Sequence, residues 1–229
     1  MFEQFDAYCE RTDFSFWSEP VNALTNLAFI LAALIAWRRI GGRAAHPLSQ
    51  TLCLILFIIG IGSFLFHSFA TAWASLADTL PILAYVVTYI FAATFLILRQ
   101  PGWRSAALTL AGLVFAVFAG RALGAILPLG SSSTYAGIPV LIALYSVILR
   151  GRDPETAKGW IIGAGILAVS IIFRTLDGPI CDSFPLGTHF LWHILNAVML
   201  CHMILVLEHG YAKVVLERGR PLASPPRQR

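Results

Sequence analysis

Seven apolar stretches of about twenty residues are the feature that most constrains the fold of this chain. A helix of about 20 residues spans roughly the 30 Å hydrocarbon core of a bilayer. Lipid offers no hydrogen bonds, so a spanning segment must pair its own backbone groups, which favours helices. Charged residues make up 12% of the chain, about half the fraction usual in soluble domains. The sequence therefore predicts an all-α membrane protein, a bundle of seven transmembrane helices.

The expected spans are joined by short polar loops, and the fifth contains Pro139, which is expected to bend it. A transmembrane domain is expected over residues 1–212. A basic, proline-rich tail over 213–229 is expected to be disordered and cytoplasmic. The spans are expected at 21–38, 51–70, 79–98, 104–123, 134–149, 159–174 and 188–209.

Basic residues are concentrated in alternate loops, and this asymmetry predicts the orientation of the bundle. The opposite loops carry only Arg11, Arg121 and Arg174. The side rich in lysine and arginine faces the cytoplasm, so the N-terminus is predicted outside and the C-terminus inside. The residues on the predicted cytoplasmic side are Arg38, Arg39, Arg43, Arg99, Arg104, Arg150, Arg152, Lys158, Lys213, Arg218 and Arg220.

Three histidines and an aspartate fall on the same predicted side of the membrane. His67 ends the second span, Asp78 follows eleven residues later, and His189 and His193 begin the last span. An imidazole in hydrocarbon is costly, so it indicates function. Residues four apart share one helix face, so His189 and His193 can reach one ion. Three histidines with one open position are the ligand set of a catalytic zinc.

Two further residues near this cluster have side chains suited to hydrolysis. Ser63 lies one turn before His67 and can donate a hydrogen bond to a developing oxyanion. Asp78 can accept the proton of an activated water and pass it to a leaving group. A lone histidine in an apolar helix is also found hydrogen-bonded to a neighbour, and His46, His202 and His209 are assigned no chemistry.

Short motifs spread along most of the chain resemble those of the alkaline ceramidase family, within a wider group of seven-helix hydrolases that includes the adiponectin receptors. Their order and spacing match that family. The matching segments are Tyr8-Cys9-Glu10, Trp17-Ser18-Glu19-Pro20-Val21-Asn22, Thr25-Asn26, Gly62-Ser63, His67, Asp78 and His189 with Trp192-His193.

The resemblance implies an intramembrane Zn²⁺-dependent hydrolase. It assigns the metal to His67, His189 and His193, proton transfer to Asp78, and assistance at the water to Ser63. The implied reaction cleaves the amide of ceramide, or of another N-acyl lipid, to a free amine lipid and a fatty acid. The compact loops look like the bacterial branch of the family, which implies an inner membrane with the site towards the periplasm. Amide and ester substrates stay open, because both pass through a tetrahedral oxyanion.

The N-terminal segment carries two further expectations. Animal members of the family hold Ca²⁺ there, and Glu10 and Glu19 match its acidic positions, whereas Ala7 and Thr12 stand where that pattern has an acid and an amide. A hard cation needs several oxygen ligands, so a calcium site depends on others nearby. Separately, Cys9 and Cys181 share the predicted outer side, where an oxidising compartment permits a disulfide; the alternative is two free thiols.

Two other classes of function compete with the hydrolase. One is a seven-helix lipid receptor or sensor with a weak or vestigial metal site, which binds lipid without turnover. Short loops and a short tail favour the enzyme over signalling. The other is a redox metalloprotein such as a lipid desaturase, whose diiron site needs more histidines and carboxylates than are gathered here. The sequence does not indicate nucleic-acid binding.

Overall fold

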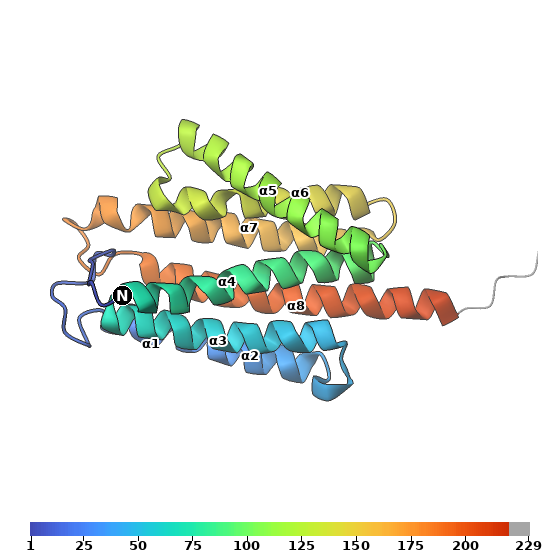
Figure 1. Cartoon of the computed structure of the whole chain (residues 1–229), viewed down its shortest axis with the longest axis horizontal. Helices are drawn as coiled ribbons and strands as arrows, with labels where there is room; N and C mark the ends of the chain where they lie inside the picture. Colours follow the sequence, from blue (N-terminus) through green and yellow to red (C-terminus); the bar gives the residue numbers. More distant parts are fainter. Residues whose placement is uncertain (220–229) are drawn as a thin grey trace, which may run out of the picture.

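The computed structural model describes residues 1–219, and these residues form a bundle of long helices (Figure 1). Seven helical segments are long and apolar enough to cross a membrane, as the sequence predicts. The helices are α1 (Pro20–Thr25), α2 (Leu27–Arg39), α3 (Pro47–Phe69), α4 (Ala72–Ala92), α5 (Gly102–Ile126), α6 (Ser133–Leu149), α7 (Pro154–Leu176) and α8 (His189–Gly219).

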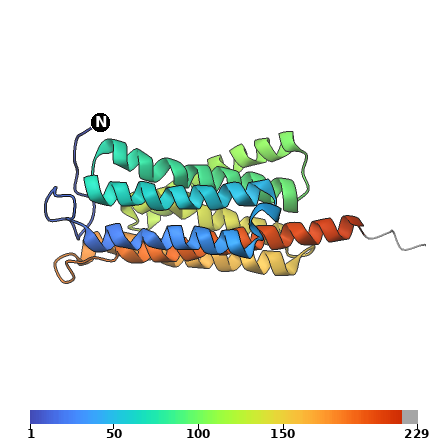
Figure 2. The same cartoon turned by 90° about the horizontal axis from the view of Figure 1, so that it is seen from below.

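Neighbouring helices pack in a ring, with α2 against α3, α3 against α4, α4 against α5, α5 against α6, α6 against α7, and α7 against α8. The contact between α2 and α8 closes the ring. The beginning and the end of the described chain lie at opposite ends of the bundle (Figures 1 and 2). An odd number of crossings requires this arrangement.

The outer surface of the bundle is apolar, because large hydrophobic side chains on several helices remain exposed. Leu31, Leu110 and Phe118 are 59%, 65% and 64% exposed. A helix face of this kind is stable when lipid covers it. The core is lined by small and aliphatic residues such as Ala36, Leu56 and Ile204.

Several helix boundaries differ from those expected. The first span is divided into α1 and α2 at Asn26, and α4 begins at Ala72, before the expected start at residue 79, with Pro81 inside the helix. Asp78, expected in the loop before the third span or at the start of that span, lies inside α4. At the other end, α8 runs to Gly219, into the tail expected from residue 213, and extends past the other helices (Figures 1 and 2). The remaining tail residues, 220–229, lie outside the described part of the chain.

Close helix contact fixes the position of Asp78. A Cβ added at Gly62 in α3 would lie 2.0 Å from the carbonyl oxygen of Ala77 and 3.2 Å from the amide nitrogen of Asp78. Only glycine permits backbones to approach this closely. The sequence Gly62-Ser63 therefore brings α3 onto α4 at the level of Ser63 and Asp78.

Candidate metal centre

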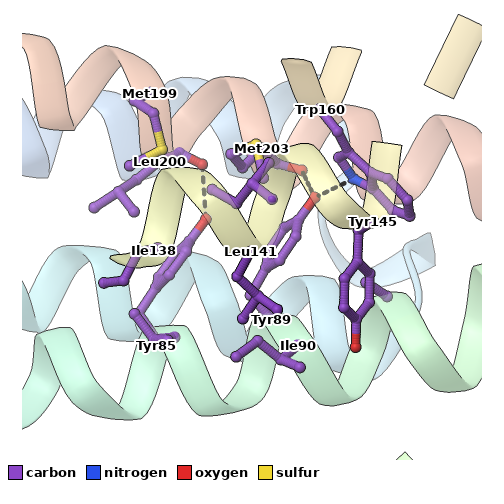
Figure 3. A pocket seen from close by; sticks show the side chains of 13 residues that line it. Tyr85, Tyr89, Ile90, Ile138, Leu141, Tyr145, Trp160, Met199, Leu200 and Met203 are labelled. Atoms are coloured by element: carbon purple, nitrogen blue, oxygen red, sulfur yellow. Dashed lines mark hydrogen bonds between the residues drawn. The ribbon is translucent and has the colours of Figure 1, made fainter. Parts of the chain in front are cut away.

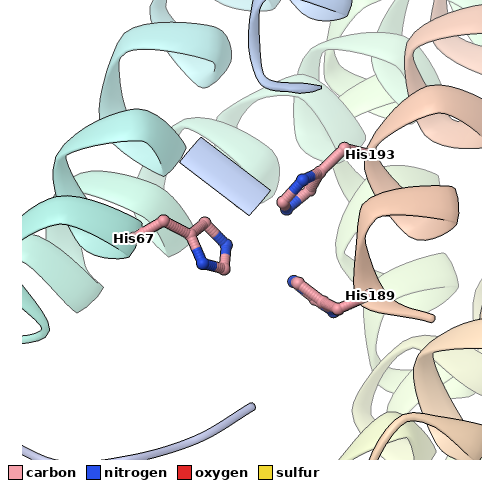
Figure 4. Close-up of side chains that lie close together, drawn as sticks. All are labelled: His67, His189 and His193. Atoms are coloured by element: carbon pink, nitrogen blue, oxygen red, sulfur yellow. The ribbon is translucent and has the colours of Figure 1, made fainter. Parts of the chain in front are cut away.

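Three histidines from two helices lie together at the end of the bundle that carries the N-terminal segment. The rings of His67, near the end of α3, and of His189 and His193, in the first turns of α8, face one shared space (Figure 4). Their ring centroids are 4.6 to 5.1 Å apart. One ligand atom from each lies within 4.8 Å of the others. The predicted cluster is thus assembled, and all three side chains are buried.

The hydrogen bonds of His67 and His193 leave a lone pair free on each ring. His67 donates from Nδ1 to the Glu19 carboxylate at 2.6 Å. Thr25 donates its hydroxyl proton to the Val21 carbonyl at 2.8 Å, so its oxygen accepts from His193 Nδ1 at 2.9 Å. A neutral imidazole that donates from one nitrogen is an acceptor at the other.

A histidine can hold a metal ion only through a ring nitrogen that is not already hydrogen-bonded. Nε2 of His67 and Nε2 of His193 are buried and have no hydrogen-bond partner among the described residues. His189 turns one of its ring nitrogens towards the same space (Figure 4). A buried polar atom without a partner is destabilising, and a cation would relieve that cost. A tetrahedral zinc ion with ligands at about 2.1 Å places them roughly 3.4 Å apart. The ligand atoms lie within 4.8 Å of one another, so side-chain rotations that draw the rings together would let the three histidines hold a zinc ion.

Ser63 and Asp78 lie at the same level of the bundle as His67. Ser63 is one helical turn before His67 in α3, and Gly62 brings α3 against α4 at the position of Asp78. Ser63 is buried and Asp78 is partly exposed. The structure thus puts both residues at the same end of the bundle as the histidines, and their catalytic roles stay predictions.

The N-terminal segment covers this cluster. Residues 1–5 hydrogen-bond to the turn between α3 and α4, including Phe5 to Ala70 at 3.0 Å. The Tyr8 ring stacks on His189 with centroids 3.6 Å apart. Burial raises the pKa of Tyr8 above its usual value, although the positive charge of Arg174 partly opposes this, so the hydroxyl stays protonated at alkaline pH.

Cys9 and Cys181 are joined by a disulfide in the structure, which ties this cover to the loop before α8. Asp177 reinforces the link. Its carboxylate accepts from the backbone N–H of Cys9 at 3.0 Å, Thr188 at 2.7 Å and His189 at 2.9 Å. Carboxylates are favourable at a helix N-terminus, and here this one fixes the first residue of α8, which is a predicted metal ligand.

Glu10 and Glu19, the acids matched to a calcium site, each have hydrogen-bond donors. Glu10 accepts from the backbone N–H of Val21 at 2.7 Å and of Asn22 at 2.8 Å. Glu19 accepts from Arg11 and His67. Burial alone would raise the Glu19 pKa, but the His67 hydrogen bond and the nearby positive charges hold it below its usual value. Calcium binding stays a prediction.

Sequence reasoning missed four residues that hold the site: Arg11, Thr25, Tyr8 and Asp177. Arg11 and Arg174 were counted only as loop charges that report orientation. In the structure Arg174 lies over the rings of Tyr135 and Trp192, at 5.3 and 5.6 Å from their centroids. The available signals were Thr25, one helical turn after Asn22 in an apolar segment, and Asp177, twelve residues before His189.

Comparison with known proteins agrees with this geometry. The family model described as "Ceramidase" matches residues 7–220. The chain belongs to the ceramidase family. A curated relative, "Alkaline ceramidase" of Drosophila melanogaster, is 23% identical over 220 residues, which cover 90% of this chain and 76% of the relative. With its seven apolar helices, this family member is an integral membrane protein.

Proposed function

We propose that this ceramidase-family protein is an intramembrane, zinc-dependent hydrolase that cleaves the amide bond of ceramide or a related N-acyl lipid. The products are a free amine lipid and a fatty acid. The observation that carries the proposal is the buried group of His67, His189 and His193, whose free ring nitrogens converge in a family named for ceramide hydrolysis.

The chain's own residues divide the work of hydrolysis. When bound to the three histidines, zinc supplies a Lewis acid that lowers the pKa of water to about 7. Asp78 accepts a proton from the attacking water and delivers it to the amine leaving group. Ser63 donates a hydrogen bond to the oxygen that gains negative charge as the carbonyl becomes tetrahedral. Burial of the histidines and Ser63 strengthens their electrostatic contacts, whereas Asp78 is partly exposed.

Two apolar pockets that share lining residues lie inside the bundle, and together they suit a lipid chain. Phe29 and Trp192 begin the first part, next to His193; the Phe29 and His193 ring centroids are 6.1 Å apart. This part shares Tyr85, Ile138 and Met199 with a second apolar part (Figure 3). The Tyr85 hydroxyl is hydrogen-bonded and does not leave a free polar group in the pocket, because it donates to the Leu200 carbonyl at 2.8 Å. We propose that one acyl or alkyl chain of the substrate lies here.

Trp160 and Tyr89 close the far end of this pocket. The Trp160 indole donates to the Tyr89 hydroxyl at 3.0 Å, and Tyr89 donates to the Met203 carbonyl at 3.1 Å (Figure 3). From His193 to Met203 the helix advances about 15 Å, which is the length of an extended alkyl chain of about twelve carbons. We therefore propose that the pocket measures chain length.

We further propose that the site faces the periplasm in a bacterial inner membrane. The loops rich in lysine and arginine lie at the other end of the bundle, which favours a cytoplasmic position for that end. Reaction of single introduced cysteines with an impermeant thiol reagent tests this orientation. Labelling of residue 42 from outside intact cells would contradict it.

Purified protein tests the enzymatic proposal. We expect about one zinc per chain by elemental analysis, and release of fatty acid from a fluorescent ceramide. Replacing any of the three histidines by alanine should remove both zinc and activity. Asp78→Asn should keep zinc and lose turnover, whereas Asp182→Asn, a change of an exposed acid, should alter neither. Lipid binding without turnover in the zinc-loaded protein would favour a receptor over a hydrolase.

A further inference from the structure

A buried arginine lies directly behind the candidate metal site. Arg11 is 4% exposed although it lies in the N-terminal segment, where charged side chains usually reach water. Its guanidinium donates from Nε to Glu19 Oε1 at 2.5 Å, from Nη1 to the Asp13 carbonyl at 3.0 Å and from Nη2 to the His67 carbonyl at 2.8 Å. Three directional bonds from one planar group fix its position.

The hydrogen bond from Arg11 to His67 is made to a carbonyl oxygen in the last turn of α3. The last carbonyls of a helix have no N–H donor within the helix, and they carry partial negative charge. Here Ala70 adopts a left-handed conformation with φ 48°, and its N–H bonds back to Phe66, ending the helix. The His67 carbonyl is therefore open to a cation, and the guanidinium satisfies it.

Glu19 links Arg11 to the imidazole ring of His67 through its two carboxylate oxygens. Its Oε1 binds Arg11, while its Oε2 accepts from His67 Nδ1 at 2.6 Å and from Asn22 Nδ2 at 3.2 Å. A buried carboxylate without a nearby cation is strongly disfavoured. Arg11 supplies that cation, and so allows Glu19 to stay charged while it orients the ring.

We propose that Arg11 is a positioning residue that holds His67 at both its backbone and, through Glu19, its ring, so that Nε2 faces the metal. The proposal rests on the zinc site proposed above. It also gives the N-terminal segment a cation of its own: the Arg11 guanidinium neutralises Glu19, and two backbone N–H groups already satisfy Glu10. The protein therefore needs no calcium ion to order this segment.

Zinc affinity measures this role without any lipid substrate. Partners that orient a metal-bound histidine typically change metal affinity about 10- to 100-fold when they are replaced. We expect Arg11→Met to weaken zinc binding by about that factor in competition with a chromophoric chelator. Arg11→Lys keeps the charge but loses the planar fork, so it should lie between Arg11→Met and the wild type. Arg121→Met, a change of an exposed arginine in α5, is the matched control and should bind zinc normally.

Cobalt substitution and a double mutant separate positioning from general stability. The visible spectrum of the Co²⁺-loaded protein should change in Arg11→Met, because one imidazole is reoriented. Glu19→Gln should weaken zinc binding similarly. The double variant Arg11→Met with Glu19→Gln should bind zinc no more weakly than the single variant of lower zinc affinity, since both residues act through one network. An Arg11→Met protein with a lower melting temperature but unchanged zinc affinity and cobalt spectrum would overturn the proposal.

Calcium titration provides the opposing test. Zinc-loaded wild-type protein, freed of calcium by a selective chelator, should show no heat of calcium binding and no change in melting temperature. Calcium binding in the micromolar range, lost in Glu19→Gln, would show that the segment depends on a metal ion and would overturn the role given to Arg11. Because neither readout uses a lipid, failure to hydrolyse ceramide would leave this result interpretable.

Discussion

Individual side chains around the histidines decide which nitrogen of each ring is free. Glu19 and Thr25 each accept a hydrogen bond from a histidine Nδ1–H, and this leaves Nε2 of His67 and of His193 free to face the centre. The sequence was enough to predict that the three histidines come together, because polar groups stand out in apolar helices; the roles of Ser63 and Asp78 stay predictions. It did not allow prediction of their supporting partners, since a threonine or a buried arginine resembles many others until the chain folds.

Thr25→Val tests this support at His193. The variant keeps the shape of the side chain but removes the oxygen that accepts from Nδ1, so the ring loses its preferred tautomer. We expect zinc affinity to fall about 10-fold, at the lower end of such effects, with the melting temperature of the apoprotein little changed. Thr51→Val removes an exposed hydroxyl that binds only the carbonyl one turn earlier, and it serves as control. Equal zinc affinity in both variants would contradict this role for Thr25.

At the scale of helices, close approach of α3 and α4 sets the position of Asp78, the proposed proton-transfer group. The pattern of apolar residues predicted both helices, but it left Asp78 between a loop and a helix start. The deciding contact is between Gly62 and the backbone of Ala77 and Asp78. A glycine in a helix has many explanations, so its partner could not be identified from one sequence without the neighbouring helix.

Gly62→Ala should therefore lower turnover with little effect on zinc. The added Cβ would lie 2.0 Å from the Ala77 carbonyl oxygen, so α4 must shift by about an ångström and move Asp78 with it. Misplacement of that size costs up to about 100-fold in rate. Gly165→Ala, where a Cβ would meet no atom within 4 Å, is the control and should stabilise α7 slightly. The measurements are kcat with a fluorescent ceramide and zinc content; an unchanged kcat would argue against positioning by this contact.

Across the whole molecule, the seven apolar stretches were enough to predict the number of spans and the bundle. The interior pocket was not predictable in this way, because its walls come from helices distant in sequence, including α4, α6, α7 and α8. Hydropathy distinguishes lipid from water but does not distinguish an apolar side chain that faces lipid from one that faces a pocket.

Trp160→Ala should lengthen the pocket and change substrate preference. Removal of the indole opens the closed end, so we expect the ratio of kcat/KM for long over short acyl chains to rise about 10-fold, the size of effect that one or two methylenes have in an apolar pocket. Trp103→Ala, which removes a tryptophan that is 70% exposed, should leave that ratio unchanged. A series of ceramides that differ only in acyl length provides the measurement. An equal fall in kcat/KM for every acyl length would contradict the proposal that the pocket measures chain length.

The N-terminal segment, tied down by Cys9 and by Arg11, also limits the routes by which lipid reaches the histidines. Because this segment covers the histidines on the side that faces water, a lipid with two hydrocarbon chains would have to enter between helices from the surrounding leaflet. The liberated acid and amine then return to that same leaflet. Such an enzyme would change the composition of one leaflet before the other, so the first effect of its activity would be a difference in area between the two leaflets.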